Sequence, residues 1–288
     1  SAVGMNAMTA NTTGTHNTAF GSRALDANTT GTYNAAIGYN ALSANTTAVK
    51  NTAVGYIAME DNTTGARNAA VGADSLKNNT TGNNNTGVGV DALAANTTGG
   101  NNTAVGYQAL DNVTDAGNEM TAVGAFALSG AQDGVANVGV GCSAAAALST
   151  GSQTTAIGFH AGKAITTGSR HTIVGAYAAR SITTANDCTA IGYNSLRDNT
   201  TGERNTALGD NCLYSNTTGS DCTAVGHEAL KANTTGDENT AVGRNALSAN
   251  TTGDKNTAVG MYASYTQSTV DQITAIGYKA GYKNVAAQ

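Results

Sequence analysis

Residues 51–67 have the sequence Asn-Thr-Ala-Val-Gly-Tyr-Ile-Ala-Met-Glu-Asp-Asn-Thr-Thr-Gly-Ala-Arg, and versions of this unit fill almost the whole chain. The fifth residue of the unit is a glycine that follows an apolar β-former. Seventeen such glycines occur, from Gly4 to Gly277, and every interval between them is 17 residues except one of 18, between Gly106 and Gly124. Because a fixed period is the signature of repeat architectures, we expect one repeat domain over residues 1–288.

The consensus of the unit is Asn-Thr-Ala-Val-Gly-x-x-Ala-Leu-x-x-Asn-Thr-Thr-Gly-x-x, and we number its positions 1 to 17. The unit is too short for two helices and a turn, but it can hold two short strands and two tight turns. Thr-Ala-Val is typical of a strand, and Asn-Thr-Thr-Gly has the chemistry of a turn. The sequence therefore predicts an all-β fold, a parallel β-solenoid or β-roll of about seventeen 17-residue coils that stack at about 4.8 Å.

The size of the residues at each position indicates which side faces the interior. Position 8 holds nothing larger than cysteine, which predicts a narrow, closely packed core. Position 3 is alanine or glycine in every coil except at Ile173, whereas position 4 is always valine, isoleucine, leucine or phenylalanine. Adjacent strand residues point to opposite faces, and position 1 accepts Met120, Cys188, Cys222 and Ile273, as a buried row would. We therefore place position 3 inside and position 4 outside; the opposite arrangement stays open and would suit a monomer.

Two further expectations follow from these rows. Asparagine at positions 1 and 12 is expected to stack into amide ladders. An outward apolar row at position 4 would expose a patch several coils long, which soluble monomers rarely tolerate, so we expect self-association into a side-by-side homotrimer. The candidate interface residues are Val54, Val71, Val88, Val105, Val123, Val225, Val242 and Val259.

The unit Asn51-Thr52-Ala53-Val54-Gly55-Tyr56-Ile57-Ala58 resembles the head repeats of trimeric autotransporter adhesins, and it is similar to repeats of phage and cyanophage tail fibres. The resemblance extends from Ala2 to about Ala280. It implies a left-handed parallel β-roll, three chains packed side by side, and a location outside the cell, on its surface or on a virion. The adhesin repeat is shorter and lacks the Asn-Thr-Thr-Gly turn, and the sequence has no coiled-coil stalk or membrane anchor, so a fibre is favoured over an autotransporter.

The repeat degenerates over residues 111–190, where the Asn-Thr-Thr-Gly turn is lost. Large apolar residues replace asparagine at position 12, and aromatic residues gather just after the repeat glycine. One interpretation is a lateral contact patch for a partner or a neighbouring chain; the other is local repacking in which this corner turns inward. The candidate patch residues are Phe126, Leu148, Phe159, Ile165, Tyr177 and Ile182.

No pattern typical of catalysis or of a metal site is present. The four cysteines lack the close pairs of metal clusters, so we expect free, buried thiols at Cys142, Cys188, Cys212 and Cys222. The four histidines occupy four different rows, and no nucleophile elbow or phosphate-binding loop occurs. We expect no enzyme activity and no cofactor.

A row of carboxylates at position 16 raises the alternative of a Ca²⁺ site. Charges of mixed sign lie next to that row, which favours a solvated edge. The carboxylates are Glu203, Asp237, Asp254 and Asp271.

The net charge of −5 and the absence of a basic block argue against nucleic acid as a partner, and no apolar run is long enough to cross a membrane. The leading expectation is an extracellular structural fibre segment or adhesin, such as a tail-fibre shaft or receptor-binding rod. Its expected partners are its own copies and host-surface carbohydrate. The alternatives are a filament subunit that stacks head to tail and a monomeric ice-binding solenoid. Against the last, the threonines of Asn-Thr-Thr-Gly would lie at a turn rather than on a flat strand face.

Overall fold

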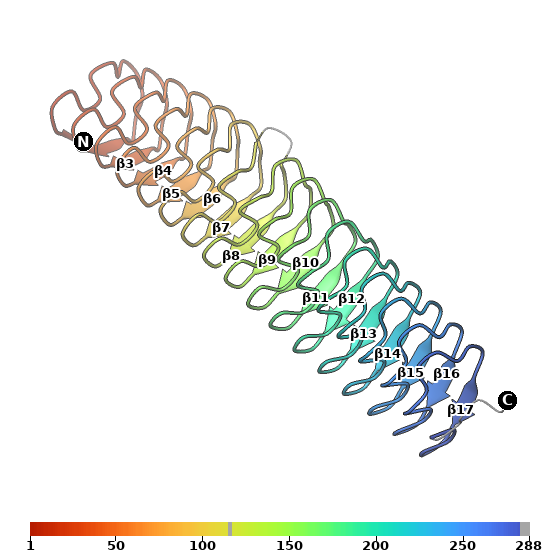
Figure 1. Cartoon of the computed structure of the whole chain (residues 1–288). Helices are drawn as coiled ribbons and strands as arrows, with labels where there is room; N and C mark the ends of the chain where they lie inside the picture. Colours follow the sequence, from red (N-terminus) through yellow and green to blue (C-terminus); the bar gives the residue numbers. More distant parts are fainter. Residues whose placement is uncertain (115–116, 283–288) are drawn as a thin grey trace. The chain divides into compact units, whose positions relative to one another are not determined.

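A computed structural model describes residues 1–114 and 117–282. The described residues form seventeen short strands, all paired in parallel, and no helix. The chain divides into two compact units, Ser1–Ser143 and Ala144–Gln288. In each unit one strand begins each coil, and the coils follow one another in chain order (Figure 1). The predicted parallel β-solenoid is therefore confirmed.

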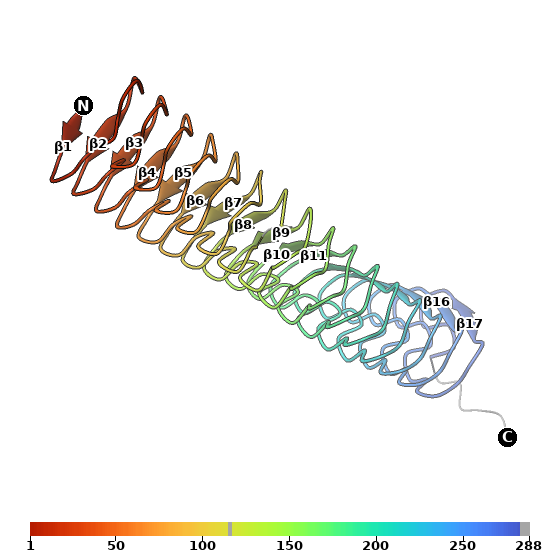
Figure 2. The same ribbon diagram turned by 90° about the horizontal axis from the view of Figure 1, so that it is seen from above.

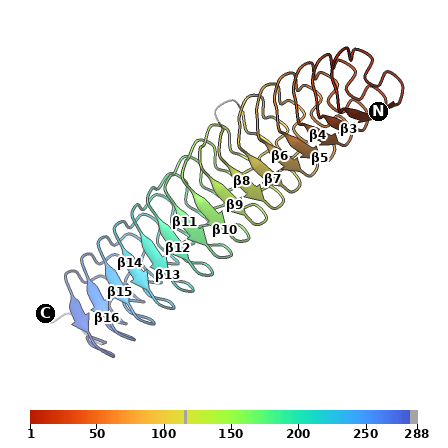
Figure 3. The same ribbon diagram turned by 180° about the vertical axis from the view of Figure 1, so that it is seen from behind.

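The strands of unit 1 are β1 (Ala2–Val3), β2 (Thr18–Phe20), β3 (Ala35–Ile37), β4 (Thr52–Val54), β5 (Ala69–Val71), β6 (Thr86–Val88), β7 (Thr103–Val105), β8 (Thr121–Val123) and β9 (Val138–Val140). Those of unit 2 are β10 (Thr155–Ile157), β11 (Thr172–Val174), β12 (Thr189–Ile191), β13 (Thr206–Leu208), β14 (Thr223–Val225), β15 (Thr240–Val242), β16 (Thr257–Val259) and β17 (Thr274–Ile276). Within each unit the loops between strands repeat the same course (Figure 2), and the strands form one face (Figure 3).

The pairing register follows the sequence period. Thr52 of β4 pairs with Ala69 of β5, one period later, so each motif position becomes a row across the coils. The single longer interval does not disturb this alignment, because Thr103 of β7 pairs with Thr121 of β8. The extra residue therefore lies outside the strands.

Each coil has one strand rather than the expected two. After the repeat glycine the backbone enters the left-handed region at positions 7, 9 and 17, as at Arg23 (φ 59°), Leu25 (φ 52°) and Tyr33 (φ 60°). Such residues cannot continue a pleated strand. Their N–H groups still bond to neighbouring coils, since Leu25 donates to the carbonyl of Ala41 at 3.1 Å. The prediction of a second strand was wrong, although this segment is held coil to coil by hydrogen bonds.

The interior contains the small strand residues and the leucines of position 9. In β2, Ala19 is 1% exposed and the adjacent Phe20 is 58% exposed, and the same alternation recurs in the strands that follow. Leu25, Leu42 and Leu76 are among the largest fully buried side chains. The prediction that position 3 faces inward and position 4 outward is confirmed.

The two asparagine rows differ in their bonding. At position 12, the Nδ2 of Asn45 donates to the Oδ1 of Asn28 at 2.8 Å, so these side chains form an amide ladder. At position 1, the Oδ1 of Asn34 accepts the backbone N–H of Asn51 at 3.0 Å, and its Nδ2 donates to the carbonyl of Ala48 at 2.8 Å. The ladder at position 12 is confirmed, whereas position 1 bonds to the backbone because its amide lies beside peptide groups of the turn.

The repeat glycine is required by close contact between coils. Gly55 has φ 147°, and a Cβ on it would lie 2.3 Å from the carbonyl oxygen of Gly72. This backbone region is essentially restricted to glycine. A side chain here would push the coils apart, which explains why the period is marked by glycine throughout.

Candidate functional site

The outer face of the solenoid presents positions 2 and 4 of each strand, and we call this surface the outer strand face. All eight candidate interface valines lie on it. Val71, Val88, Val105 and Val123 are exposed, with Val71 at 41%. Val54, Val225, Val242 and Val259 are half-buried. In unit 1 the face therefore presents an apolar row along its successive strands.

Aromatic residues at position 6 extend this apolar surface beyond the repeat glycine. Tyr39, Tyr56 and Tyr107 are all exposed. The rings of Tyr39 and Tyr56 stack with centroids 5.6 Å apart, one coil after the other. Tyrosine combines a large apolar ring with a polar tip, so this row suits contact with another molecule.

The outer strand face also has a threonine row at position 2, which the sequence reasoning overlooked. Thr52, Thr103 and Thr223 belong to it. In the described part of the chain no hydrogen bond involves their hydroxyl groups. The threonines at position 13 differ, because the Oγ1 of Thr29 donates to the carbonyl of Thr46 at 3.1 Å. Strict alternation in Thr-Ala-Val would have placed this second threonine row beside the valines.

Half of the predicted lateral contact patch lies in the core. Leu148, Ile165 and Ile182 are completely buried, so they contribute nothing to an exposed surface. In their coils position 9 is occupied by Ala145, Gly162 and Ala179, whereas the consensus has leucine. The large residues at position 12 fill the volume that the missing leucines leave. The patch prediction was wrong for these three residues, and the alternative of an inward-turned corner is the correct one.

The aromatic members of that patch are at the surface but in different units. Phe126, in unit 1, is 40% exposed and meets the ring of Tyr107 edge-on at 5.2 Å. Phe159, in unit 2, is 43% exposed, and Tyr177 is half-buried. Each unit thus has its own aromatic contact, and the one in unit 2 is the larger.

Four rings in three successive coils form the aromatic cluster of unit 2. Phe159 and His160 stack at 3.9 Å, Phe159 meets Tyr177 edge-on at 5.3 Å, and Tyr177 approaches Tyr193 at 6.2 Å. Burial lowers the pKa of His160, and the positive charges of Lys163 and Arg180 lower it further. All of these effects favour the neutral form of the His160 ring.

A surface hollow of about 360 Å³ lies beside this cluster. Its wall combines ring faces with guanidinium groups, an arrangement that can hold an apolar face and an anionic group together. The lining residues are His160, Tyr177, Arg180, Tyr193, Asn194 and Arg197.

The cysteines are single thiols in different surroundings. Cys188, Cys212 and Cys222 are buried, and burial raises the pKa of each to about 11. Cys142 is exposed, which corrects the expectation of a fourth buried thiol; it occupies position 6, whose side chains point outward. No group of three or more potential metal ligands occurs among residues 1–114 and 117–282.

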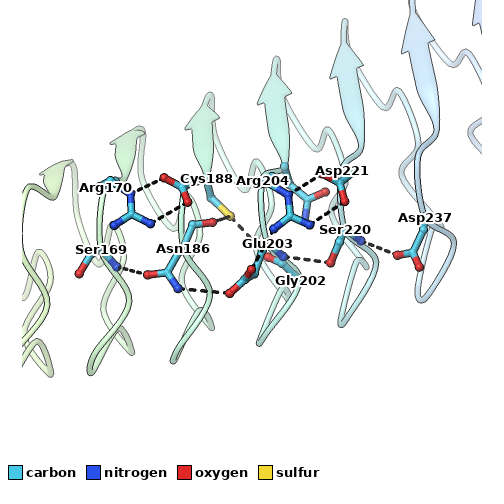
Figure 4. A network of polar contacts seen from close by, with 12 residues as sticks. Ser169, Arg170, Asn186, Cys188, Gly202, Glu203, Arg204, Ser220, Asp221 and Asp237 are labelled. Atoms are coloured by element: carbon cyan, nitrogen blue, oxygen red, sulfur yellow. Dashed lines mark hydrogen bonds and ion pairs between the residues drawn. The ribbon is translucent and has the colours of Figure 1, made fainter.

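The carboxylates of position 16 take part in an outer ladder (Figure 4). The Oδ1 of Asp237 accepts the backbone N–H of Ser220 at 2.7 Å, and the Oγ of Ser220 accepts that of Glu203 at 3.1 Å. Beside this row, Arg204 holds Asp221 of the next coil through two hydrogen bonds, at 2.6 and 2.9 Å. These side chains therefore connect successive coils.

No family model matches the chain, and no curated protein matches it. The part of the chain that the structure describes contains no helix long and apolar enough to span a membrane.

Proposed function

We propose that this chain is a non-catalytic structural segment of an extracellular fibre, of the kind found in phage tail fibres or bacterial surface adhesins. Copies associate side by side through the outer strand face, most simply as a homotrimer. The observation that carries the proposal is the outward valine row, which repeats coil after coil in register with the backbone. Apolar rows of this length favour a partner.

A second copy of the chain is a suitable partner for geometric reasons. Every coil repeats the same pattern at about 4.8 Å, so a surface with the same period matches it at many points at once. Identical chains provide that period without any further adaptation. Burying one valine side chain completely contributes about 1.5–3 kcal/mol, so modest burial at many coils gives a stable assembly.

The test is the mass in solution, by size-exclusion chromatography with light scattering. We expect about three times the chain mass of 28.6 kDa. The double variant Val88→Asp/Val105→Asp puts charges on the outer strand face and should give a monomer that keeps the β-rich circular dichroism spectrum. Thr64→Asp/Thr81→Asp, with the same added charge at exposed position 14, is the matched control and should remain assembled.

A monomeric wild-type chain would overturn the proposed assembly. Species that grow with concentration and time would instead favour a head-to-tail filament, because the open edges of a solenoid can pair with each other.

Ice binding remains a second candidate because of the threonine row at position 2. This row lies on the flat strand face, beside the valines, and its hydroxyl groups have no partner among the described residues. Thermal hysteresis separates the two functions. A monomer that lowers the freezing point, and loses this effect in Thr86→Arg/Thr103→Arg, would favour ice binding; an assembled chain without hysteresis would favour the fibre.

A further inference from the structure

We infer that the hollow beside the aromatic cluster of unit 2 binds an acidic saccharide, one that carries a carboxylate or sulfate group. The inference deepens the proposed fibre function, on which it rests for its biological setting, by assigning an adhesive site and a ligand class. The site itself needs only unit 2.

Two cations of a row at position 10, Arg180 and Arg197, line this hollow, and the third member of the row, Lys163, lines a neighbouring hollow together with Arg180. Lys163, Arg180 and Arg197 are spaced one coil apart, which puts like charges next to each other at about the coil spacing of 4.8 Å. Such neighbours repel, so the row does not stabilise the fold by itself. An anion bound between the cations would relieve this repulsion.

The other cations of these coils are paired, in contrast to this row. Arg170 holds Asp187, and Arg204 holds Asp221, each with an N–O distance of 2.6 Å. Within residues 117–282, Lys163 and Arg180 form no ion pair, and Arg197 has only Asp198, at 3.6 Å. The row therefore retains positive charge for a ligand, even though the whole chain is acidic.

Aromatic faces supply the apolar half of the site. Tyr193 is 53% exposed and lines the hollow together with Tyr177. The guanidinium of Arg180 lies 5.7 Å from the ring centre of Tyr177, and that of Arg197 lies 4.9 Å from the ring centre of Tyr214. These contacts orient both guanidinium groups, so less side-chain freedom is lost on binding.

Polar groups in the same hollow can bond sugar hydroxyls. Asn194 offers both an amide donor and a carbonyl acceptor. The ring of His160 also lines the hollow, but its Nδ1 is buried, so it contributes its ring and not that nitrogen. Aromatic rings and an amide in one hollow favour a ligand with a C–H face and hydroxyl groups over a bare anion.

The dimensions of the site favour a saccharide over a nucleic acid. The hollow of about 360 Å³ and a second one of about 520 Å³, which is lined by Lys163 and Arg180, are local features of a few coils. Single-stranded nucleic acid binds grooves whose positive charge follows the backbone over many nucleotides. The net charge of −5 opposes such long polyanions.

The experiment is isothermal titration of the full chain with 3′-sialyllactose, lactose, a sulfated heparin tetrasaccharide, inorganic sulfate and oligothymidine. We expect at least one acidic saccharide to bind about tenfold more tightly than lactose, and more tightly than sulfate, with affinity falling as salt rises. Arg180→Gln/Arg197→Gln should weaken this binding about tenfold or more. Tyr193→Ala should also weaken it.

The matched control is Arg170→Gln/Arg204→Gln, which removes the same charge from a different row of unit 2, at position 17, and should bind within about twofold of wild type. Equal loss in the control, equal binding of lactose, or no binding of any saccharide would overturn the inference. If oligothymidine bound more tightly than every acidic saccharide, the site would be assigned to nucleic acid instead. If sulfate bound more tightly than they do, the site would be a simple anion site. Light scattering of the same samples reports the assembly separately, so failure of the ligand site and failure of the fibre proposal are distinguishable.

Discussion

A Cβ added to Gly162 would lie 2.8 Å from the Cδ1 of Ile165, three residues later in the same coil. The small residue at position 9 and the large residue at position 12 therefore share one volume of the core. Ten coils have leucine or methionine at position 9 and asparagine at position 12 in the corresponding places, as at Leu42 and Asn45. The degenerate coils keep a filled interior while losing the amide ladder.

This relationship predicts strong coupling between the two positions. Gly162→Leu should destabilise the fold by about 1–3 kcal/mol through overpacking, although its φ of 58° is close to that of the consensus leucines. Ile165→Asn should cost about 2–5 kcal/mol. In Gly162→Leu/Ile165→Asn, the loss of unfolding free energy should be smaller than the sum of the two single losses by about 1 kcal/mol or more. Urea unfolding of the four proteins measures this difference. As a control, the stability losses of Gly162→Leu and of the distant Asn233→Ala should add up in the double variant. If the losses of Gly162→Leu and Ile165→Asn also added up, the two positions would not share one volume.

The repeat glycine should tolerate no side chain. Gly55→Ala puts a Cβ against a backbone carbonyl of the next coil at a φ of 147°, and we expect a loss of at least about 2 kcal/mol. Gly100→Ala is the control, because its nearest atom would be 3.1 Å from the new Cβ and its φ is not positive. Thermal unfolding followed by circular dichroism compares the two. Similar midpoints would show that the coils can separate to admit a methyl group.

Removing an amide of the position-12 ladder should destabilise the fold most where that amide is completely buried. Asn45 is completely buried and bonds to the amides of both neighbouring coils, so Asn45→Ala should cost about 1–3 kcal/mol by leaving buried partners unsatisfied. Asn11 is half-buried and bonds to one neighbouring amide. Water can replace its missing bonds, so Asn11→Ala should have the smaller effect on the urea midpoint. The reverse order would mean that the ladder contributes little.

His171 should make the fold sensitive to acid. It occupies the asparagine row at position 1 and is 2% exposed, and burial lowers its pKa in the folded chain. The unfolded chain binds a proton near its ordinary pKa of about 6.5, so protons favour unfolding and stability falls as the pH drops below that value. His171→Asn restores the consensus amide and should reduce the difference between urea midpoints at pH 8 and pH 5. An unchanged difference in His171→Asn would show that this histidine does not cause the sensitivity to acid.

One of the four cysteines should react with a thiol reagent in the folded chain, and the other three should not. At pH 8 the thiols of Cys188, Cys212 and Cys222 remain protonated, because burial raises the pKa of each to about 11. A disulfide reagent should therefore modify only Cys142 in the folded chain and all four thiols in denaturant. Cys142→Ser should abolish the reaction in the folded state. Modification of more than one thiol without denaturant would show that the core opens easily.

The sequence by itself determined the period, the parallel register and the side of the strand that faces inward. Gly55 and its equivalents mark a fixed interval, and a fixed interval in a stacked fold has only one alignment of rows. The small residues at positions 3 and 8 specify a narrow core, and alternation then directs Val54 and its row outward. These conclusions depend on residue size and spacing, which are read directly from the chain.

Only the tertiary structure decided the path between the repeat glycine and the turn, and the orientation of position 12 in the degenerate coils. Leucine does not favour the left-handed backbone found at Leu25 and Leu42; hydrogen bonds between coils and burial of the side chain impose it. Likewise, position 12 is buried in the regular coils too, as at Asn45, and the larger Ile165 fits there because Gly162 has no side chain. Conformational propensity is a property of a single residue, whereas the core volume is shared between residues and between coils. Packing therefore decided the backbone path and the filling of the core, which the local sequence left open.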